Sequence, residues 1–300
     1  EDTSNRTTIL SNYIYSNEDS SYMKAYKDPL MITVSEDRTD TMFLSADTLL
    51  SYKVGEQNKL YFYDSIKTDS IIRTDTQTDS FKIVRAYYKM KMIQGEMSAV
   101  SDSLYYSEKD SIFKLYINPI MWMDSTQITG DSIYLYTKNK EIEKVDVFGN
   151  GFIVNLQDEN IYNQIKGKFI QAFISNKKIT RVEVDGNAES IYFIKDKEKE
   201  TYSGANKSTS ALITVSFNDG EVNRIKLTGA PEAVFTPMKK INLETFKLDG
   251  FKWHGNLQPL TKYDVIRDKS QYEKYVLEHP IKDVKDVNET KEEEIKTDDQ

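Results

Sequence analysis

A unit of two strands joined by a polar turn occurs three times in this chain of 300 residues, and it restricts the fold more than any other feature. The copies run from Gly130 to Asn150, from Gly167 to Asn187 and from Ser210 to Ala230, so their starts are 37 and 43 residues apart. The turns are Lys138-Asn139-Lys140, Ser175-Asn176-Lys177 and Asn218-Asp219-Gly220, which are typical of hairpins. A hairpin unit cannot bury its apolar face alone and must stack on its neighbours.

Looser copies of the unit occur upstream. Asp102-Ser103-Leu104 and Asp47-Thr48-Leu49 match Asp131-Ser132-Ile133, and residues 24–31 match residues 114–121 at a constant offset of 90. About six units therefore begin near residues 11, 46, 101, 130, 167 and 210.

Within each unit apolar and polar residues alternate, which indicates strands with one buried face. Tyr134, Lys144 and Glu183 are expected on the outer face. The predicted apolar lining consists of Ile133, Leu135, Val145, Val147, Ile170, Ala172, Val182, Val184, Ile213, Val215, Ile225 and Leu227. The predicted fold class is all-β: stacked antiparallel hairpins that form a sandwich, a β-jellyroll or a V-shaped trough.

The chain divides by composition into three parts. Residues 1–245 form the β-domain, with Ile9 to Tyr15 as its first strand and long loops at 65–80 and 195–209. Residues 246–280 are expected to fold over the edge of the last hairpin as a cap, with a short helix between Lys262 and His279. Residues 281–300 carry eight acids and four lysines, a net charge of −4, and are predicted to be a disordered acidic tail.

Several classes of protein are excluded by composition. The chain has no cysteine and two histidines, which leaves no thiol catalysis and little for a histidine-based metal site. A net charge of −8 argues against a nucleic-acid partner. No apolar run approaches the roughly 18 residues of a membrane-spanning helix. Glu1 is interpreted as the start of a mature or trimmed chain.

The polar residues that stand out have structural explanations. Asp47, Asp102, Asp110 and Asp131 each precede Ser or Thr where a strand begins, and there a carboxylate bonds to backbone N–H groups; the same spacing also fits an O-glycosylation sequence. His254 is expected to make a structural contact. Lysines at the hairpin turns are either solvated or meet phosphates. We therefore predict no catalytic residue, no metal and no cofactor.

The pattern Gly-Asp-x-Ile-x-Leu, turn, Ile-x-x-Val-x-Val-x-Gly-Asn resembles the OstA-like repeat of lipopolysaccharide transport proteins, a family that includes LptA and the periplasmic part of LptD. The resemblance rests on Gly130-Asp131-Ser132-Ile133, Gly149-Asn150, Gly186-Asn187-Ala188 and Ala46-Asp47-Thr48-Leu49, and it covers about residues 10–255. The Asp-Ser-Leu-Tyr-Tyr segment at 102–106, Asn118-Pro119 and the segment from Leu248 to Trp253 resemble the branch found in Bacteroidota.

The resemblance implies a periplasmic protein, with association with the outer membrane left open, that binds lipopolysaccharide and forms a transport bridge. Lipid A acyl chains would lie in the apolar trough, and other OstA-type jellyrolls (LptC- or LptD-like) would pair with its edge strands. Two alternatives remain from the residues alone. One is a structural or interaction protein, such as a β-solenoid scaffold or adhesin stalk, whose lining is dry core. The weaker one is a polysaccharide-acting enzyme built on a β-helix.

Overall fold

The computed structural model describes residues 6–17, 21–35, 40–54, 80–138, 141–196, 201–218 and 220–279. The strands are β1 (Thr7–Leu10), β2 (Tyr13–Asn17), β3 (Tyr22–Tyr26), β4 (Leu30–Val34), β5 (Thr41–Ser45), β6 (Thr48–Val54), β7 (Phe81–Gln94), β8 (Met97–Ser107), β9 (Ile112–Tyr116), β10 (Ile120–Met123), β11 (Thr126–Thr129), β12 (Ser132–Lys138), β13 (Glu141–Asp158), β14 (Ile161–Ser175), β15 (Lys178–Lys195), β16 (Tyr202–Asn218), β17 (Glu221–Thr228) and β18 (Glu232–Pro237). The helices are η1 (Met238–Lys240), η2 (Gly255–Leu257), η3 (Lys262–Asp264) and α1 (Lys269–Glu278). The predicted all-β class is confirmed, because these strands form one 18-stranded antiparallel sheet.

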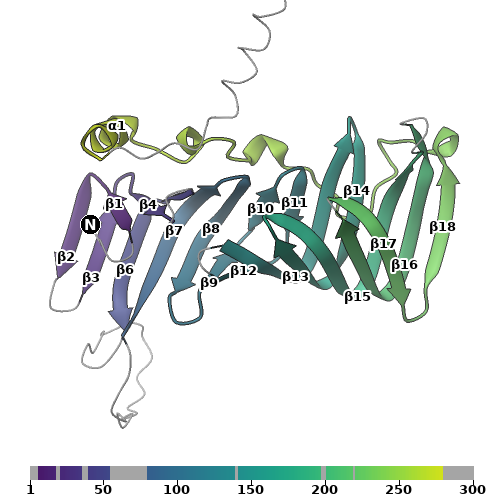
Figure 1. Ribbon diagram of the computed structural model, residues 1–300, viewed down its shortest axis with the longest axis horizontal. Helices are drawn as coiled ribbons and strands as arrows, with labels where there is room; N and C mark the ends of the chain where they lie inside the picture. Colours follow the sequence, from purple (N-terminus) through teal and green to yellow (C-terminus); the bar gives the residue numbers. More distant parts are fainter. Residues whose placement is uncertain are drawn as a thin grey trace, which may run out of the picture.

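The sheet is folded into two layers along an elongated molecule (Figure 1). The first layer contains β2, β3, β6, β9, β12 and β17, and the second contains β1, β4, β5, β10, β11 and β18. The long strands β7, β8, β13, β14, β15 and β16 run through both layers, so they join the layers along one side. The inner faces of the two layers enclose the main apolar core.

The long strands pass from one layer to the other at irregularities in their register. These shifts fall between Phe148 and Gly151 in β13 and between Asp185 and Ala188 in β15. Two consecutive residues with positive φ occupy each of these points: Gly149 and Asn150 in the first, Gly186 and Asn187 in the second. Glycine and asparagine adopt this left-handed conformation at low cost. The Gly-Asn pairs of the sequence repeat therefore bend the sheet into a V, and we call this bend the corner.

The same geometry explains the matched segments 24–31 and 114–121. Lys27 and Asp28 have positive φ, as do Ile117 and Asn118, and each pair is followed by proline and a strand of the second layer. These segments are thus corner crossings in which the strand is interrupted. The upstream units that the sequence suggested lie in the same two layers as the clear repeats.

The glycines that open the units allow close approach at the corner. A Cβ atom on Gly130 would overlap Cγ1 of Val147, and one on Gly167 would overlap Cγ1 of Val184. Both valines belong to the main core cluster and are fully buried. The motif therefore places a residue without a side chain where the two layers converge.

The C-terminal segment, defined as residues 238–279, runs back along the outer face of the second layer toward the N-terminal end, where α1 lies beside β1 and β4 (Figure 1). Leu248 and its neighbours pack against Phe152 and Phe193, and Tyr272 of α1 packs against Phe43 with ring centroids 5.9 Å apart. The segment thus covers a second apolar surface, separate from the interior.

Side-chain amides fix this segment to the sheet. Gln164 accepts a hydrogen bond from the backbone N–H of Leu248 at 2.8 Å. Gln127 accepts one from the N–H of His254 at 2.6 Å and donates to the carbonyl of Lys252 at 2.8 Å. Farther along, Arg267 forms an ion pair with Asp47. These contacts give the segment one register along the sheet.

Four expectations differ from the structure or lie outside it. The predicted loop 195–209 is wrong from residue 202, because β16 pairs there with β15 and β18. The predicted first strand from Ile9 to Tyr15 is two strands, β1 and β2, which lie in different layers. The segment after residue 245 packs on the face of the second layer rather than over the edge of the last hairpin, because that face is apolar. Residues 65–79 and 281–300 lie outside the described residues.

Replacing Gly167 by alanine should destabilise the fold by about 1–3 kcal/mol, because the added methyl overpacks the corner against Val184. Val184→Ala removes the methyl that it would strike. The double variant should therefore be more stable than the sum of the two single effects by at least about 0.5 kcal/mol, measured by urea unfolding. Gly220→Ala, where nothing lies within 4 Å, is the control and should be additive with Val184→Ala.

Gln164→Ala should leave the buried N–H of Leu248 without an acceptor and cost about 1–3 kcal/mol of folding stability. Limited proteolysis should then cut more readily between residues 241 and 260. Gln157→Ala changes an exposed glutamine on the adjacent strand β13 and should leave both readouts unchanged. Equal proteolysis of the two variants would contradict the role given to Gln164.

Candidate functional site

The first-layer wall of the interior contains the residues that the repeats predicted to form one apolar lining. The ten buried in the main core cluster are Ile133, Leu135, Val145, Val147, Ile170, Ala172, Val182, Val184, Ile213 and Val215. Ile225 and Leu227 lie on the edge strand β17, where they are partly buried and pack against that cluster. All twelve therefore share one wall, and the wall becomes more accessible toward its β17 end.

Strand register arranges this wall in continuous rows. One row crosses the first layer from β9 to β17 through Leu115, Ile133, Val147, Ile170, Val184, Ile213 and Leu227. A parallel row runs through Phe113, Leu135, Val145, Ala172, Val182, Val215 and Ile225. The residues that alternate with them, such as Tyr134 and Glu183, face outward as predicted. The rows form an uninterrupted apolar surface along the molecule.

The opposite wall, on the second layer, was missed by the sequence analysis. Its central row passes through Met31, Leu44, Met92, Ala99, Met121, Ile128, Ile153 and Ile165. The irregular residues at the corner shift the alternation. The inward positions after residue 150 therefore cannot be predicted by continuing the alternation that precedes it. The row then continues to Ser190 and Ser208, which are buried serines. Apolar character therefore decreases toward the C-terminal end of this wall.

The side of the V opposite the corner is a seam, where hairpin ends of the two layers face each other. No strand pairing of the described residues joins the layers along it. Two cavities lie there, of about 290 and 310 Å³, and Gln94 borders both. The first reaches Met31, Met42 and Val84 of the core, and the second reaches Met97 and Met123. The interior is thus accessible from the seam.

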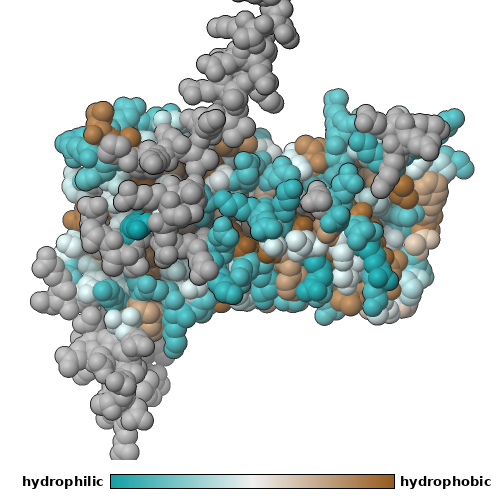
Figure 2. Space-filling view, viewed as in Figure 1, coloured by the Kyte–Doolittle hydropathy of each residue, from teal (hydrophilic) through white to brown (hydrophobic). Residues whose placement is uncertain are grey.

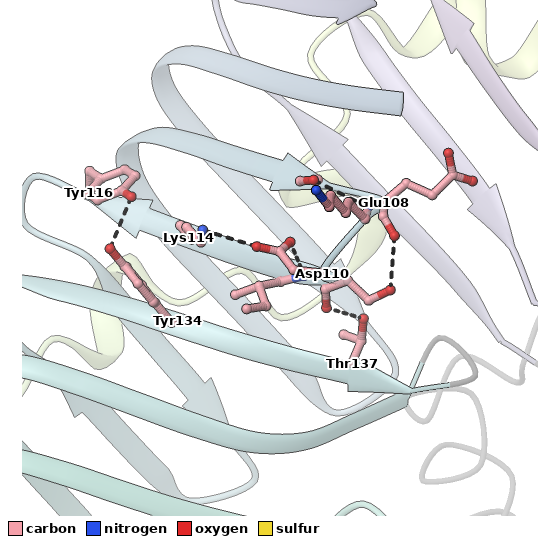
Figure 3. A network of polar contacts seen from close by, with 10 residues as sticks. Glu108, Asp110, Lys114, Tyr116, Tyr134 and Thr137 are labelled. Atoms are coloured by element: carbon pink, nitrogen blue, oxygen red, sulfur yellow. Dashed lines mark hydrogen bonds and ion pairs between the residues drawn. The ribbon is translucent and has the colours of Figure 1, made fainter. Parts of the chain in front are cut away.

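The first-layer rim of the seam is polar (Figure 3). Glu108 accepts a hydrogen bond from the N–H of Lys82 at 2.9 Å, and Thr137 donates one to the carbonyl of Ser111 at 2.7 Å. These four residues border the first cavity. A polar rim above a deeper apolar region is an arrangement that accommodates an amphiphile, with its head group at the rim and its alkyl chain below.

One ion pair crosses the seam among the described residues. Nζ of Lys177, on the turn between β14 and β15, lies 3.4 Å from Oδ2 of Asp40, beside β5. Asp40 also accepts hydrogen bonds from the N–H of Thr41 at 2.9 Å and from Gln94 at 3.4 Å. The side chain of Asp40 is 15% exposed and that of Lys177 is 59% exposed. The carboxylate is therefore held in place by the second layer, while the lysine reaches it from solvent.

The aspartates that precede Ser or Thr form no common cluster, although Asp102 and Asp131 border the same open cleft. Asp131 accepts hydrogen bonds from Asn150 at the corner, and Asp47 binds Arg267. Asp110 accepts from Lys114 at 3.3 Å (Figure 3). His254 bonds through its backbone to Gln127, and burial, with the nearby charge of Lys252, lowers the pKa of its imidazole. Each of these groups has a local structural partner.

An open cleft of about 820 Å³ lies between the C-terminal segment and the corner. Lys89, Lys91 and Lys252 contribute positive charge to it, and Asp102 and Asp131 contribute negative charge. Its mixed charge selects no ligand of one sign. Within the described ranges, no group of three or more His, Cys, Asp or Glu side chains is placed to hold a metal ion. In the same ranges, no helix has the length and apolar character needed to cross a membrane.

Comparison with protein-family models finds no match, and comparison with curated proteins finds none either. A solved structure with similarity is the crystal structure of LptH from Pseudomonas aeruginosa, described as the LptA homologous periplasmic component of the conserved lipopolysaccharide transport device. The two are 18% identical, the match covers 47% of this chain and 95% of that chain, and the TM-score is 0.37. This similarity is too low to assign a function, which depends instead on the interior itself.

Proposed function

We propose that this protein carries lipopolysaccharide through the periplasm, as a bridge toward the outer membrane. The acyl chains of lipid A would lie between the two layers, and the sugars and phosphates would remain outside the seam. The observation that carries the proposal is a single apolar interior, continuous across the stacked hairpins and open at cavities along one side.

The free energy of an acyl chain in this interior suits transport of a lipid rather than catalysis. Each methylene group that leaves water contributes about 0.8 kcal/mol, so an acyl chain gains several kcal/mol without a directional bond. Rows of Ile, Val and Leu side chains offer nearly the same environment at every step along the sheet. A chain can therefore move along the interior without a large change in free energy.

The ends of the molecule suit strand addition. Among the described residues, β1 pairs only with β4 and β2 only with β3 at one end, and β17 and β18 each pair only with β16 at the other. Val234 and Phe235 of β18 are 64% and 50% exposed. Figure 2 shows apolar patches at this end of the molecule. Another OstA-type jellyroll, LptC- or LptD-like, would extend the sheet at these edges and make the apolar interior continuous between proteins.

The burial of the lining favours a second candidate. Most of the first-layer lining is fully buried, as in a sandwich with a dry core. A structural scaffold of stacked hairpins would have this property and would need no ligand. The two candidates differ in whether the layers separate to admit a chain. Membership of this chain in the Bacteroidota branch stays a prediction.

A photo-crosslinking residue at Ile225 should label lipopolysaccharide, while one at Lys226 should label it several-fold less. The two positions are adjacent on β17, but Ile225 faces the interior and Lys226 faces solvent. The edge strand also accepts a large side chain more readily than the buried strands do. Equal labelling at both positions would contradict an internal site.

Protein purified from cells that make lipopolysaccharide should retain a bound amphiphile in native mass spectrometry. Val184→Asp, which buries an uncompensated charge in the lining, should fold less stably and lose that adduct. Glu183→Asp changes the neighbouring outward residue and is the control. Absence of any lipid adduct from well-folded protein, with no binding on addition of lipopolysaccharide, would favour the dry scaffold.

A further inference from the structure

Methionine is concentrated on one part of the interior. Seven of the nine methionines in the chain belong to the main core cluster: Met31, Met42, Met90, Met92, Met97, Met121 and Met123. All seven lie on the second layer, on β4, β5, β7, β8 and β10. The opposite wall and the C-terminal half of the interior contain mainly Ile, Val and Leu.

Because of this difference in composition, the two walls differ in stiffness. Valine and isoleucine branch at Cβ and are stiff about χ1. Methionine is unbranched, has three rotatable side-chain bonds and adapts to irregular shapes, and it is frequent on surfaces that bind varied apolar partners. The methionine wall can therefore change shape to admit a guest at a lower cost than the Ile and Val wall.

The methionine wall also borders both seam cavities. Met31 and Met42 line the first, and Met97 and Met123 line the second. Phe113 and Tyr106 close the first from the other layer, and their rings stack with centroids 4.3 Å apart. The adaptable part of the core and the openings toward solvent thus coincide.

The ion pair between Lys177 and Asp40 closes the seam at the second cavity, which both residues line. Other ion pairs within a layer, such as Lys166 with Glu189, cannot hold the two layers together. Lys177 is the exposed partner of this pair, and an ion pair made from solvent by a long side chain contributes little to folding stability, so the lysine can leave Asp40 without unfolding the sheet. The pair can therefore act as a reversible connection between the two layers.

We propose that the methionine-lined seam is a lateral port, through which an alkyl chain of an amphiphile enters the interior between the layers, with the Asp40–Lys177 pair as its latch. The port deepens the proposed function and rests on it, because it presupposes an apolar guest. A lateral path lets a polar head group stay at the rim formed by Lys82, Glu108 and Thr137. The C-terminal end is less suited to entry, since the second-layer wall there contains buried Ser190 and Ser208.

The absence of cysteine from the sequence makes the port directly testable. In Asp40→Cys/Lys177→Cys, a short bis-maleimide should join the two layers across the seam. Loading of a fluorescent fatty acid, and separately of labelled lipopolysaccharide, should then slow by about tenfold or more, while the same variant without reagent should load at least as fast as the parent chain. Circular dichroism and the melting temperature check that the sheet is intact.

The matched control carries the same bridge within one layer. Ser216 of β16 and Arg224 of β17 are cross-strand partners within the first layer and border neither seam cavity, so bridging Ser216→Cys/Arg224→Cys leaves the seam free. It should not slow loading. Equal loading of the two bridged proteins would overturn the port but leave lipid carriage standing, whereas failure of every form, including the parent chain, to bind either probe would overturn both.

A second pair of variants tests the methionine wall. Met42→Ile keeps an apolar side chain of similar size at the port but makes it stiff, and loading should slow severalfold. Met238→Ile makes the same change in η1, outside the interior, and should have no effect. Melting temperatures of both variants separate slower loading from loss of structure. Unchanged loading in Met42→Ile would show that methionine adaptability is not needed for entry.

Discussion

The row of left-handed residues at the corner is the constraint on which the rest of this structure depends. Without it the long antiparallel strands would form one flat sheet whose apolar face had no partner. Two successive residues with positive φ bend β13 and β15, Lys89 alone has positive φ in β7, and Gly130 and Gly167 let neighbouring strands approach. Because such pairs recur along the corner, in β13 and β15 and at the interruptions before Pro29 and Pro119, the sheet closes on itself and buries its own apolar face. The repeat in the sequence is therefore a repeat of bends as much as of strands.

Folding the sheet in this way creates two apolar surfaces with different roles. The inner one is shared by both layers and forms the interior. The outer face of the second layer is also apolar, and the C-terminal segment covers it from β16 back to β1 through Gln164, Gln127 and Tyr272. With that face covered by a fixed segment, the exposed apolar side chains include Tyr13 and Ile14 of β2 at one end of the molecule and Val234 and Phe235 of β18 at the other. Exposed apolar side chains on edge strands would suit the proposed assembly through the ends.

The interior is graded along its length. Methionine dominates one wall near the N-terminal end, Ile and Val dominate the middle, and serine enters the second-layer wall near the C-terminal end. The seam cavities lie where the wall is most adaptable. In the proposed carrier, this grade would give an apolar guest an adaptable place to enter and a stiffer channel beyond it. A dry core would not require this difference between methionine and Ile or Val, because packing alone is best satisfied by side chains with well-defined rotamers.

The residue pattern alone predicted the strand class, the hairpins from Gly130 onward, and the first-layer wall from Ile133 to Leu227. It did so because alternation and turn chemistry are local and repeat in register. The second-layer wall, the two-strand start of the chain and the course of the C-terminal segment were decided only by tertiary structure. The corner residues shift the alternation, so the inward side after each bend depends on which strands pair. Asp40 and Lys177 are 137 positions apart, and only the closing of the two layers brings them together.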